Sequence, residues 1–210
     1  MKLTGESKFL LSVLLGTVTI IGAAVFFLSQ PAKSLTREEL IPTNIPTHGV
    51  ATASAYLVEF SDFQCPACAA FAPTVEKLIT ENQDRLLFAY RHFPLPQHTA
   101  AIPAARAAVA AGNQGKFWEM HTLLFKNQTA FSPEKFLELA AELKLDLPKF
   151  KTDVAAQAVN DVITADTSFG NRLGINSTPT FYLNGVKLNA PSPAELQRIV
   201  EATLNKEAGN

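Results

Sequence analysis

Strand-forming segments stand on both sides of a long helical block, and their order constrains the fold more than any other feature of the sequence. Four short apolar runs predict strands: 55–60, 85–92, 178–183 and 186–188. A helical pattern over 66–82 links the first two runs, and a block over about 98–174 shows helical patterns alone. We therefore predict an α/β fold in which a helical subdomain is inserted between two halves of one sheet.

Local signals support this order. Asn184 and Gly185, between the last two runs, are typical of a tight β-hairpin. Ser192 followed by Pro193 is typical of the N-cap and first position of a helix, so a final helix should follow the hairpin. Within the block, we expect one long helical segment after Pro148.

A run of 20 residues without a charge, Phe9–Leu28, precedes the domain. Twenty residues at helical rise match the roughly 30 Å hydrocarbon core of a bilayer. Lys2 and Lys8 put positive charge before the run, which favours a cytoplasmic N-terminus. We predict a cytoplasmic segment over 1–8 and a transmembrane anchor over 9–28. A cleaved signal peptide is the alternative, although its apolar core is typically only about 7–15 residues long.

The segment after the apolar run differs in composition from the domain that follows. Residues 29–50 contain prolines and scattered charges without a sustained period, so they predict an extended linker. The folded domain is then expected over 51–210. With the N-terminus in the cytoplasm, the anchor would hold this domain outside it, in the periplasm or at the cell exterior.

Composition excludes several classes of protein. The chain has 18 Lys plus Arg against 19 Asp plus Glu, a formal net charge of -1. Because a nucleic-acid-binding surface needs a basic excess, no nucleic-acid partner is expected. Two cysteines in 210 residues cannot build a disulfide-rich scaffold or a four-thiolate metal site.

The two cysteines lie in Cys65-Pro66-Ala67-Cys68, where the first strand gives way to the first helix. Cys65 is expected at the N-cap, where free backbone N–H groups and the helix dipole stabilise a thiolate, so we predict that it is the nucleophile. Cys68, one turn further on, should be more shielded and attack only a sulfur already joined to Cys65. This spacing lets the pair close into a redox-active Cys65–Cys68 disulfide.

Other uses of a CxxC pair stay open. The pair could be half of a zinc site, with His92 and His98 as the nearest further ligands, or an inert pair. However, these histidines fall at a strand end and in a Pro-rich loop. The placement of the cysteines between strand and helix favours redox chemistry.

Four segments carry motifs of a known family, in this order: Val58–Cys68, Tyr90–Leu95, Lys116–His121 and Asn176–Gly185. Together they resemble the DsbA-like thiol:disulfide oxidoreductases of the thioredoxin superfamily, in which the motifs follow in the same order. The resemblance runs from about residue 50 to the C-terminus. It implies a thioredoxin fold with an inserted helical subdomain, Cys65 as the exposed nucleophile and Cys68 as the resolving cysteine. It also implies that the Thr178–Pro179 bond is cis and faces the disulfide.

Glu59 is a carboxylate in an otherwise apolar strand. Burial raises the pKa of a carboxyl group, so Glu59 could exchange a proton with Cys68. The resemblance supports this role, because the family has an acidic residue six positions before the first cysteine, beneath the active site. The alternative is a Glu at the wet end of the strand. Asp62 and Gln64 are expected to shape the loop before Cys65.

The expected activity is oxidation of newly exported polypeptides that carry free cysteines, without a cofactor. The resemblance implies reoxidation by a membrane partner that passes electrons to a quinone. Strong oxidants of the family carry Pro-His between the cysteines, whereas this chain has Pro66-Ala67, which leaves the direction of electron flow open. A reductase or isomerase of the same fold, and a metal carrier or chaperone that binds through the CxxC, are the alternatives.

Overall fold

A computed structural model describes residues 14–22, 34–190 and 192–207. The chain divides into two compact units, 1–33 and 34–210. In the first unit, residues 14–22 are helical. The predicted anchor over 9–28 lies partly outside the described residues, and the segment 1–8 lies wholly outside them. Within the described ranges, no helix is both long enough and apolar enough to cross a bilayer.

The second unit contains a mixed sheet with the strand order β1-β3-β2-β4-β5. The strands are β1 (Thr47–His48), β2 (Ala55–Ser61), β3 (Leu86–His92), β4 (Thr180–Leu183) and β5 (Val186–Lys187). Strands β2 and β3 are parallel, and the other neighbouring pairs are antiparallel. This arrangement confirms the two strand regions expected on either side of the helical block.

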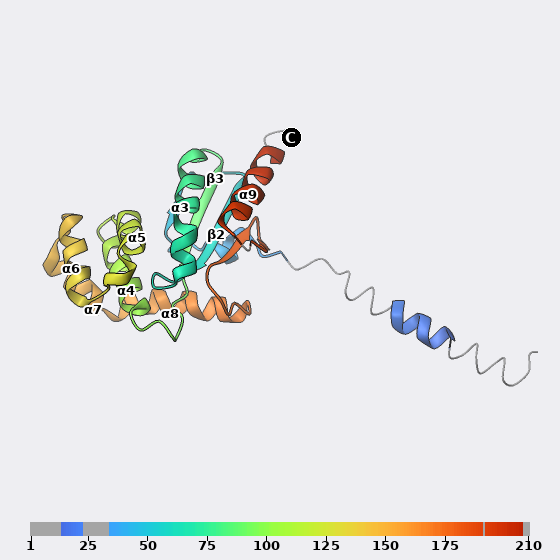
Figure 1. The fold of residues 1–210 in the computed structure, drawn as a ribbon, viewed down its shortest axis with the longest axis horizontal. Coiled ribbons are helices and arrows are strands. Elements are labelled where there is room, and N and C mark those ends of the chain that lie inside the picture. The colour runs from blue at the N-terminus through green and yellow to red at the C-terminus, as the bar shows by residue number, and fades with distance from the viewer. Residues whose placement is uncertain (1–13, 23–33, 191, 208–210) are drawn as a thin grey trace, which may run out of the picture. The chain divides into compact units, whose positions relative to one another are not determined.

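Helices follow each part of the sheet in the expected order (Figure 1). They are α2 (Arg37–Leu40), α3 (Pro66–Glu81), α4 (Ala101–Gly112), α5 (Phe117–Lys126), α6 (Pro133–Glu142), α7 (Leu147–Ala155), α8 (Gln157–Arg172) and α9 (Pro193–Glu207). In Figure 1, α4 to α7 form a group beside the sheet, and α8 runs back from this group toward it. The expected thioredoxin-like fold with a helical insertion is therefore present.

The sheet is covered on both faces. On one face, Leu57 and Phe88 join the main hydrophobic core with residues of α3, α4, α5 and α9. On the other face, Val58 and Ala89 pack in a second core that includes Leu40 of α2. Since successive side chains of a strand point to opposite faces, the odd-numbered residues of β2 lie on the side of α3. This places Glu59 on the same side as the cysteines.

Residues 34–50, expected as part of a linker over 29–50, belong instead to the compact unit that begins at Ser34, and residues 29–33 lie outside the described residues. Thr36 caps α2 in a reciprocal capping box, and Leu40 and Ile45 are buried. Arg37 donates hydrogen bonds to the carbonyl oxygens of Ala51 and Ala53. Leu40 and Ile45 bury apolar surface against the domain. The free energy gained by this burial holds the segment in place despite its loop-like composition.

The helical segment expected after Pro148 is also different, since it consists of two helices. Ala156 ends α7 and precedes α8 with an extended backbone (φ -69°, ψ 140°). Asp146 caps α7 by accepting a hydrogen bond from the Lys149 N–H. The break lets α8 leave the insertion and return to the sheet.

A buried ion pair joins α8 to β3. The Arg91 guanidinium donates to the Asp166 carboxylate at 3.0 Å, and the backbone N–H of His92 donates to the second carboxylate oxygen at 2.9 Å. The same guanidinium lies 4.3 Å from the centre of the Phe169 ring. Both charged side chains are almost fully buried, so each one satisfies the other.

We expect Asp166→Ala to lower the free energy of unfolding by about 3–5 kcal/mol, because it leaves the Arg91 charge buried without its partner. Denaturant unfolding measures this change. Asp161→Ala, on the exposed side of the same helix, is the control and should change stability by no more than about 0.5 kcal/mol. Equal effects of the two substitutions would contradict a stabilising role for the ion pair.

Candidate active site

The two cysteines lie where β2 leads into α3. Cys65 is the N-cap of α3 with an extended backbone (φ -74°, ψ 121°), and Pro66 occupies the first turn. Cys65 is 6% exposed, whereas Cys68 is completely buried, and both thiols are free. Pro66 and Ala67 are exposed between them. The helix start thus presents one sulfur near the surface and covers the other.

The site lowers the pKa of Cys65 to about 5. The largest cause is a hydrogen bond from the Cys68 thiol to the Cys65 sulfur, which outweighs the opposing effect of burial. The Thr178 side chain and the backbone N–H groups of Cys68 and Ala67, at the start of α3, also lower it. Cys65 is therefore a thiolate at neutral pH and can act both as nucleophile and as leaving group.

The site has the opposite effect on Cys68. Burial, first of all, raises its pKa, and the hydrogen bond to Cys65 and the negative charge of Glu59 add to the effect. Cys68 therefore keeps its proton at neutral pH, and it needs a base before it can attack a mixed disulfide on Cys65.

Glu59 lies on β2 and is 2% exposed, so it does not occupy the wet end of the strand. Burial raises its pKa to about 7, against a lowering effect of the Ser61 hydroxyl. At this value the carboxyl group can both accept and give a proton near neutral pH. Glu59 lies on the side of the sheet that α3 covers, and its negative charge adds to the raised pKa of Cys68.

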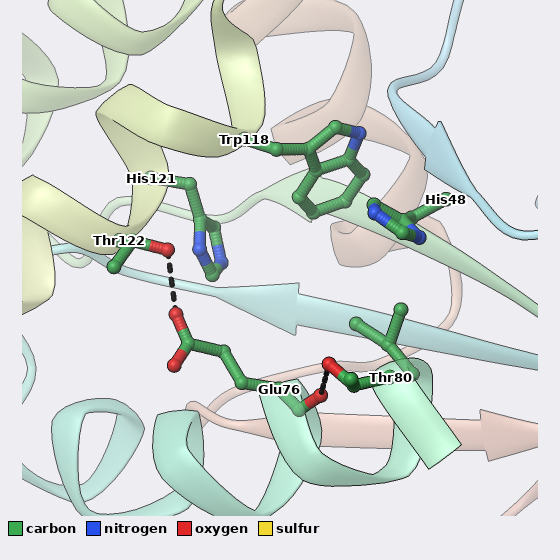
Figure 2. A pocket seen from close by; sticks show the side chains of 7 residues that line it. His48, Glu76, Thr80, Trp118, His121 and Thr122 are labelled. Carbon is green, nitrogen blue, oxygen red and sulfur yellow. Dashed lines mark hydrogen bonds between the residues drawn. The ribbon is translucent and has the colours of Figure 1, made fainter. Parts of the chain in front are cut away.

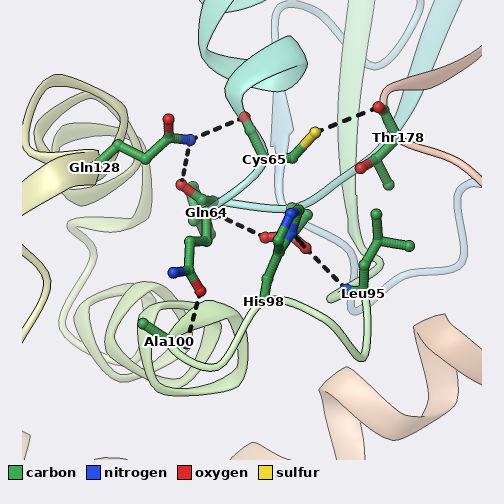
Figure 3. Close-up of polar contacts among 9 residues, drawn as sticks. Gln64, Cys65, Leu95, His98, Ala100, Gln128 and Thr178 are labelled. Carbon is green, nitrogen blue, oxygen red and sulfur yellow. Dashed lines mark hydrogen bonds and ion pairs between the residues drawn. The ribbon is translucent and has the colours of Figure 1, made fainter.

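Asp62 organises the loop before Cys65, as the sequence suggested. One carboxylate oxygen accepts a hydrogen bond from the backbone N–H of Gln64 at 2.7 Å. The other accepts from the backbone N–H of Leu95 at 2.8 Å and lies 2.7 Å from Nδ1 of His98. Figure 3 labels Gln64, Leu95 and His98, the three residues that contact this carboxylate. Asp62 therefore joins the active-site loop to the segment that follows β3.

The helical insertion also holds this loop. The Gln64 side chain accepts a hydrogen bond from the backbone N–H of Ala100 at 2.6 Å. The Gln128 amide donates to the carbonyl oxygens of Phe63 and Cys65 at 2.8 and 2.9 Å (Figure 3). The role of Gln128 is not predictable from the sequence, because Gln128 follows α5 and no local pattern indicates a contact more than 60 residues away.

The Thr178–Pro179 bond is cis, as the resemblance implied. It precedes β4 and brings Thr178 to the cysteines: Sγ of Cys65 lies 3.4 Å from the Thr178 carbonyl oxygen (Figure 3). Thr178 is 8% exposed and Pro179 is half-buried. Backbone groups of this loop therefore border the reactive sulfur, where an extended peptide can pair with them.

A zinc site was the alternative use of the cysteine pair, and it would need further ligands near Cys65 and Cys68. Among the residues that the structure describes, no group of three or more His, Cys, Asp or Glu side chains could hold a metal ion. His92 is 1% exposed beneath the loop, and His98 is engaged by Asp62.

A thioredoxin-like sheet, a CxxC pair at a helix N-terminus and a facing cis-proline loop together define a thiol–disulfide oxidoreductase. The chain belongs to the thioredoxin family, since residues 43–202 match the family described as Thioredoxin. The predicted resemblance to DsbA-like oxidoreductases is confirmed at this level.

Solved structures have the same fold. A thioredoxin-like oxidoreductase from Silicibacter pomeroyi DSS-3 is 28% identical, with a TM-score of 0.68 over 80% of this chain and 98% of that one. BdbD from Bacillus subtilis is 22% identical, with a TM-score of 0.70 over 84% of this chain and 100% of that one. At 22% identity, the second likeness shows the fold alone.

Curated relatives are much longer proteins. The Na(+)/H(+) antiporter NhaA 3 of Salinispora tropica is 34% identical over 175 residues, which cover 80% of this chain and 27% of the antiporter. The chain thus spans about a quarter of the length of the curated relatives that it matches.

Titration of the reduced protein should show the Cys65 thiolate appearing with a midpoint at about pH 5. In Cys68→Ala the midpoint should rise, because a hydrogen bond to a charged group contributes about 1.5–3 kcal/mol, roughly a 10- to 100-fold change in the thiolate–thiol equilibrium. Thiolate absorbance in the ultraviolet measures it. Cys68→Ser retains a donor and serves as the control, with a smaller rise. An unchanged midpoint in Cys68→Ala would assign the effect to the helix alone.

The raised pKa of Glu59 also predicts how stability changes with pH. Its pKa is about 7 in the folded protein against an ordinary 4.5, so the unfolded chain loses this proton first and wild-type stability falls as pH rises between those values. Glu59→Gln removes this loss. Its free energy of unfolding relative to the wild type should therefore increase between pH 4 and pH 8, by on the order of 3 kcal/mol.

Denaturant unfolding of both proteins in the reduced state tests this change. Glu142→Gln, an exposed position at the end of α6, is the matched control and should keep a constant difference from the wild type. A pH-independent difference for Glu59→Gln would mean that Glu59 is ionised in the folded protein.

Proposed function

We propose that this protein oxidises pairs of cysteines in newly exported polypeptides by exchange with its Cys65–Cys68 disulfide. The observation that carries the proposal is the unequal state of the two thiols, since one is a stable thiolate near the surface and the other is a buried thiol. The cis-proline loop beside Cys65 supports a polypeptide substrate, because its backbone can pair with an extended chain.

The exchange proceeds in two displacements. A substrate thiolate attacks Cys65, and the electrons of the protein disulfide pass to Cys68, which takes a proton from Glu59. The second substrate thiolate then attacks the substrate sulfur of the mixed disulfide, and Cys65 leaves as a thiolate. The substrate loses two electrons and the protein gains them. The low pKa of Cys65 favours this release, since thiols of low pKa leave faster.

The direction of electron flow follows from the stability of the reduced form. A thiolate that the site stabilises makes the disulfide a stronger oxidant, and the pKa of about 5 lies between about 7 for thioredoxin and about 3.5 for DsbA. Pro66-Ala67 supplies no imidazole, but the Cys68 thiol and the helix N–H groups lower the pKa instead. These values support an oxidant of intermediate strength.

The location belongs to the same proposal. A charge-free run over 9–28, preceded by Lys2 and Lys8, supports an anchored protein whose catalytic domain lies outside the cytoplasm, in the periplasm or at the cell exterior. There, newly exported chains with free cysteines are available as substrates. Reoxidation by a membrane-bound, quinone-linked thiol oxidase would complete the cycle and rests on the family resemblance.

Cys68→Ser should trap the exchange intermediate. In this variant the Cys65 thiolate can still attack a disulfide of an exported polypeptide, which releases one polypeptide thiolate and joins the other sulfur to Cys65. Because Cys68 is no longer present to attack Cys65 and release the polypeptide, mixed disulfides should accumulate in cells that make the full chain. Non-reducing electrophoresis and mass spectrometry identify them. Cys65→Ser is the control and should trap none. Absence of adducts in Cys68→Ser would sink the proposal of exchange.

The oxidant role has a separate measurement. The reduction potential of the Cys65–Cys68 pair against glutathione should lie between about -270 mV, the value for thioredoxin, and about -120 mV, the value for DsbA. A potential at or below that of thioredoxin would favour a reductase of the same fold.

A further inference from the structure

One face of the sheet beneath the cysteines carries a row of buried polar side chains. The register of β2 and β3 pairs Glu59 with Tyr90 and Ser61 with His92. Paired residues of neighbouring strands point to the same face, so all four lie on the side of α3. Each is at most 2% exposed. Such a row is unusual for the centre of a core, where apolar side chains predominate.

Three of the four side chains in this row have polar atoms without partners. In the part of the chain that the structure describes, the Ser61 and Tyr90 hydroxyls and both ring nitrogens of His92 are buried without a hydrogen bond, and so is Nε2 of His121 on α5. Buried polar groups are nearly always hydrogen-bonded, so a cluster of exceptions needs an explanation. Ser61 lies on the same face of the sheet as Glu59 and Tyr90, and its hydroxyl lowers the pKa of Glu59, of Cys68 and of Tyr90.

Ring contacts continue this row to the surface. The Tyr90 ring meets the His121 ring edge to face, with centroids 5.1 Å apart, and meets the His92 ring at 5.2 Å. The His121 ring in turn lines a cavity of about 220 Å³ (Figure 2). The other residues of this cavity are His48, Glu76, Ile79, Thr80, Trp118 and Thr122. Thr80 is exposed, so the cavity reaches the protein surface.

We propose that the Ser61 and Tyr90 hydroxyls and the His121 imidazole form a buried path that carries protons between Glu59 and this cavity. The path rests on the proposed exchange reaction and adds three positioning residues to it. It would exchange protons with solvent through a cavity whose lining does not include the cysteines or Thr178.

The exchange reaction creates the need for such a path. Glu59 gives one proton to Cys68 each time the disulfide is reduced. When Glu59 is ionised at the start, it must first take up a proton from solvent. A bound polypeptide covers the cysteines at that moment. A second route lets Glu59 reach solvent while the mixed disulfide is in place.

The chemistry of the groups suits proton transfer. A hydroxyl both accepts and donates a hydrogen bond, and a neutral imidazole accepts at one nitrogen while it donates at the other. Burial lowers the pKa of His121 to about 3, so its ring is neutral at the pH of exchange. The titratable groups that interact with Glu59 are Cys65, Cys68 and Tyr90. Asp62 acts on Tyr90, and His92 acts on His121.

The test measures the rate of a single turnover, in which the oxidised protein reacts with a reduced peptide that carries two cysteines. The reaction is run at pH 5.5 and at pH 8.5, and each sample is quenched with acid. At pH 8.5 Glu59 is mostly ionised and must first take up a proton. Tyr90→Phe should then be roughly tenfold slower than the wild type, a part of the 100-fold or more that acid–base catalysis typically contributes. At pH 5.5 the two should agree within about twofold, because Glu59 already holds its proton.

His121→Ala should show the same pH-selective defect, and added imidazole should restore its rate at pH 8.5 by entering the enlarged cavity. Imidazole should not restore Tyr90→Phe, in which the hydroxyl is lost further inside. Tyr182→Phe is the matched control, since it removes a hydroxyl on the opposite face of the sheet, and it should behave as the wild type.

The outcomes separate the proton path from the exchange reaction itself. If the wild type oxidises no peptide, the proposed function fails. If the wild type is active and Tyr90→Phe equals it at pH 8.5, the proton path alone is overturned. A defect of equal size at both pH values, without rescue by imidazole, assigns Tyr90 and His121 a structural role and also overturns it.

Discussion

The site depends on one placement: the N-terminus of α3 follows the C-terminal end of β2, the central strand, after a short loop. Cys65 occupies this point and receives the backbone N–H groups of the first turn. The loop before it is fixed by Asp62 from within and by Gln128 from the insertion. Because both contacts hold main-chain groups, the position of the sulfur follows from the backbone and not from side-chain packing alone.

Two thiols on one helix acquire opposite properties through this placement. Cys65 lies at the helix end beside Thr178, whereas Cys68, one turn later, faces the core and Glu59. The hydrogen bond between them lowers the pKa of the first and raises that of the second. A single interaction therefore assigns the two roles, nucleophile and protonated resolving thiol. The same interaction disappears when the disulfide forms, which ties the protonation of the site to its redox state.

Local patterns in the sequence predict much of this arrangement. The apolar run over 55–60 predicts a strand, and a helical pattern follows it from Pro66. Both patterns are local, so the sequence predicts that the cysteines lie between the strand and the helix. The resemblance to a known family adds the cis bond before Pro179, which no propensity would indicate. The prolines of residues 34–50 predict a linker, and this prediction is wrong. Leu40 and Ile45 of this segment are buried against a surface that distant parts of the chain form, which no local pattern indicates.

The remainder of the site could not be predicted for the same reason. Gln128 contacts residues more than 60 positions away, and the row of Ser61, Tyr90 and His92 exists only through the register of β2 with β3. Each of these side chains is ordinary in its own strand or helix. Their meaning arises when the sheet forms.

The two faces of this sheet handle buried charge in different ways. On the face of α8, Arg91 and Asp166 neutralise each other, and the pair joins the insertion to the sheet. On the face of α3, no described residue forms an ion pair with Glu59, and its burial raises its pKa to about 7. A lysine or arginine at Tyr90 would hold Glu59 ionised and remove its capacity to give a proton near neutral pH. The neutral, partly unsatisfied row beneath the cysteines thus lowers stability while it preserves a carboxyl group that can change its charge, and the paired ions on the opposite face keep the same strands in place.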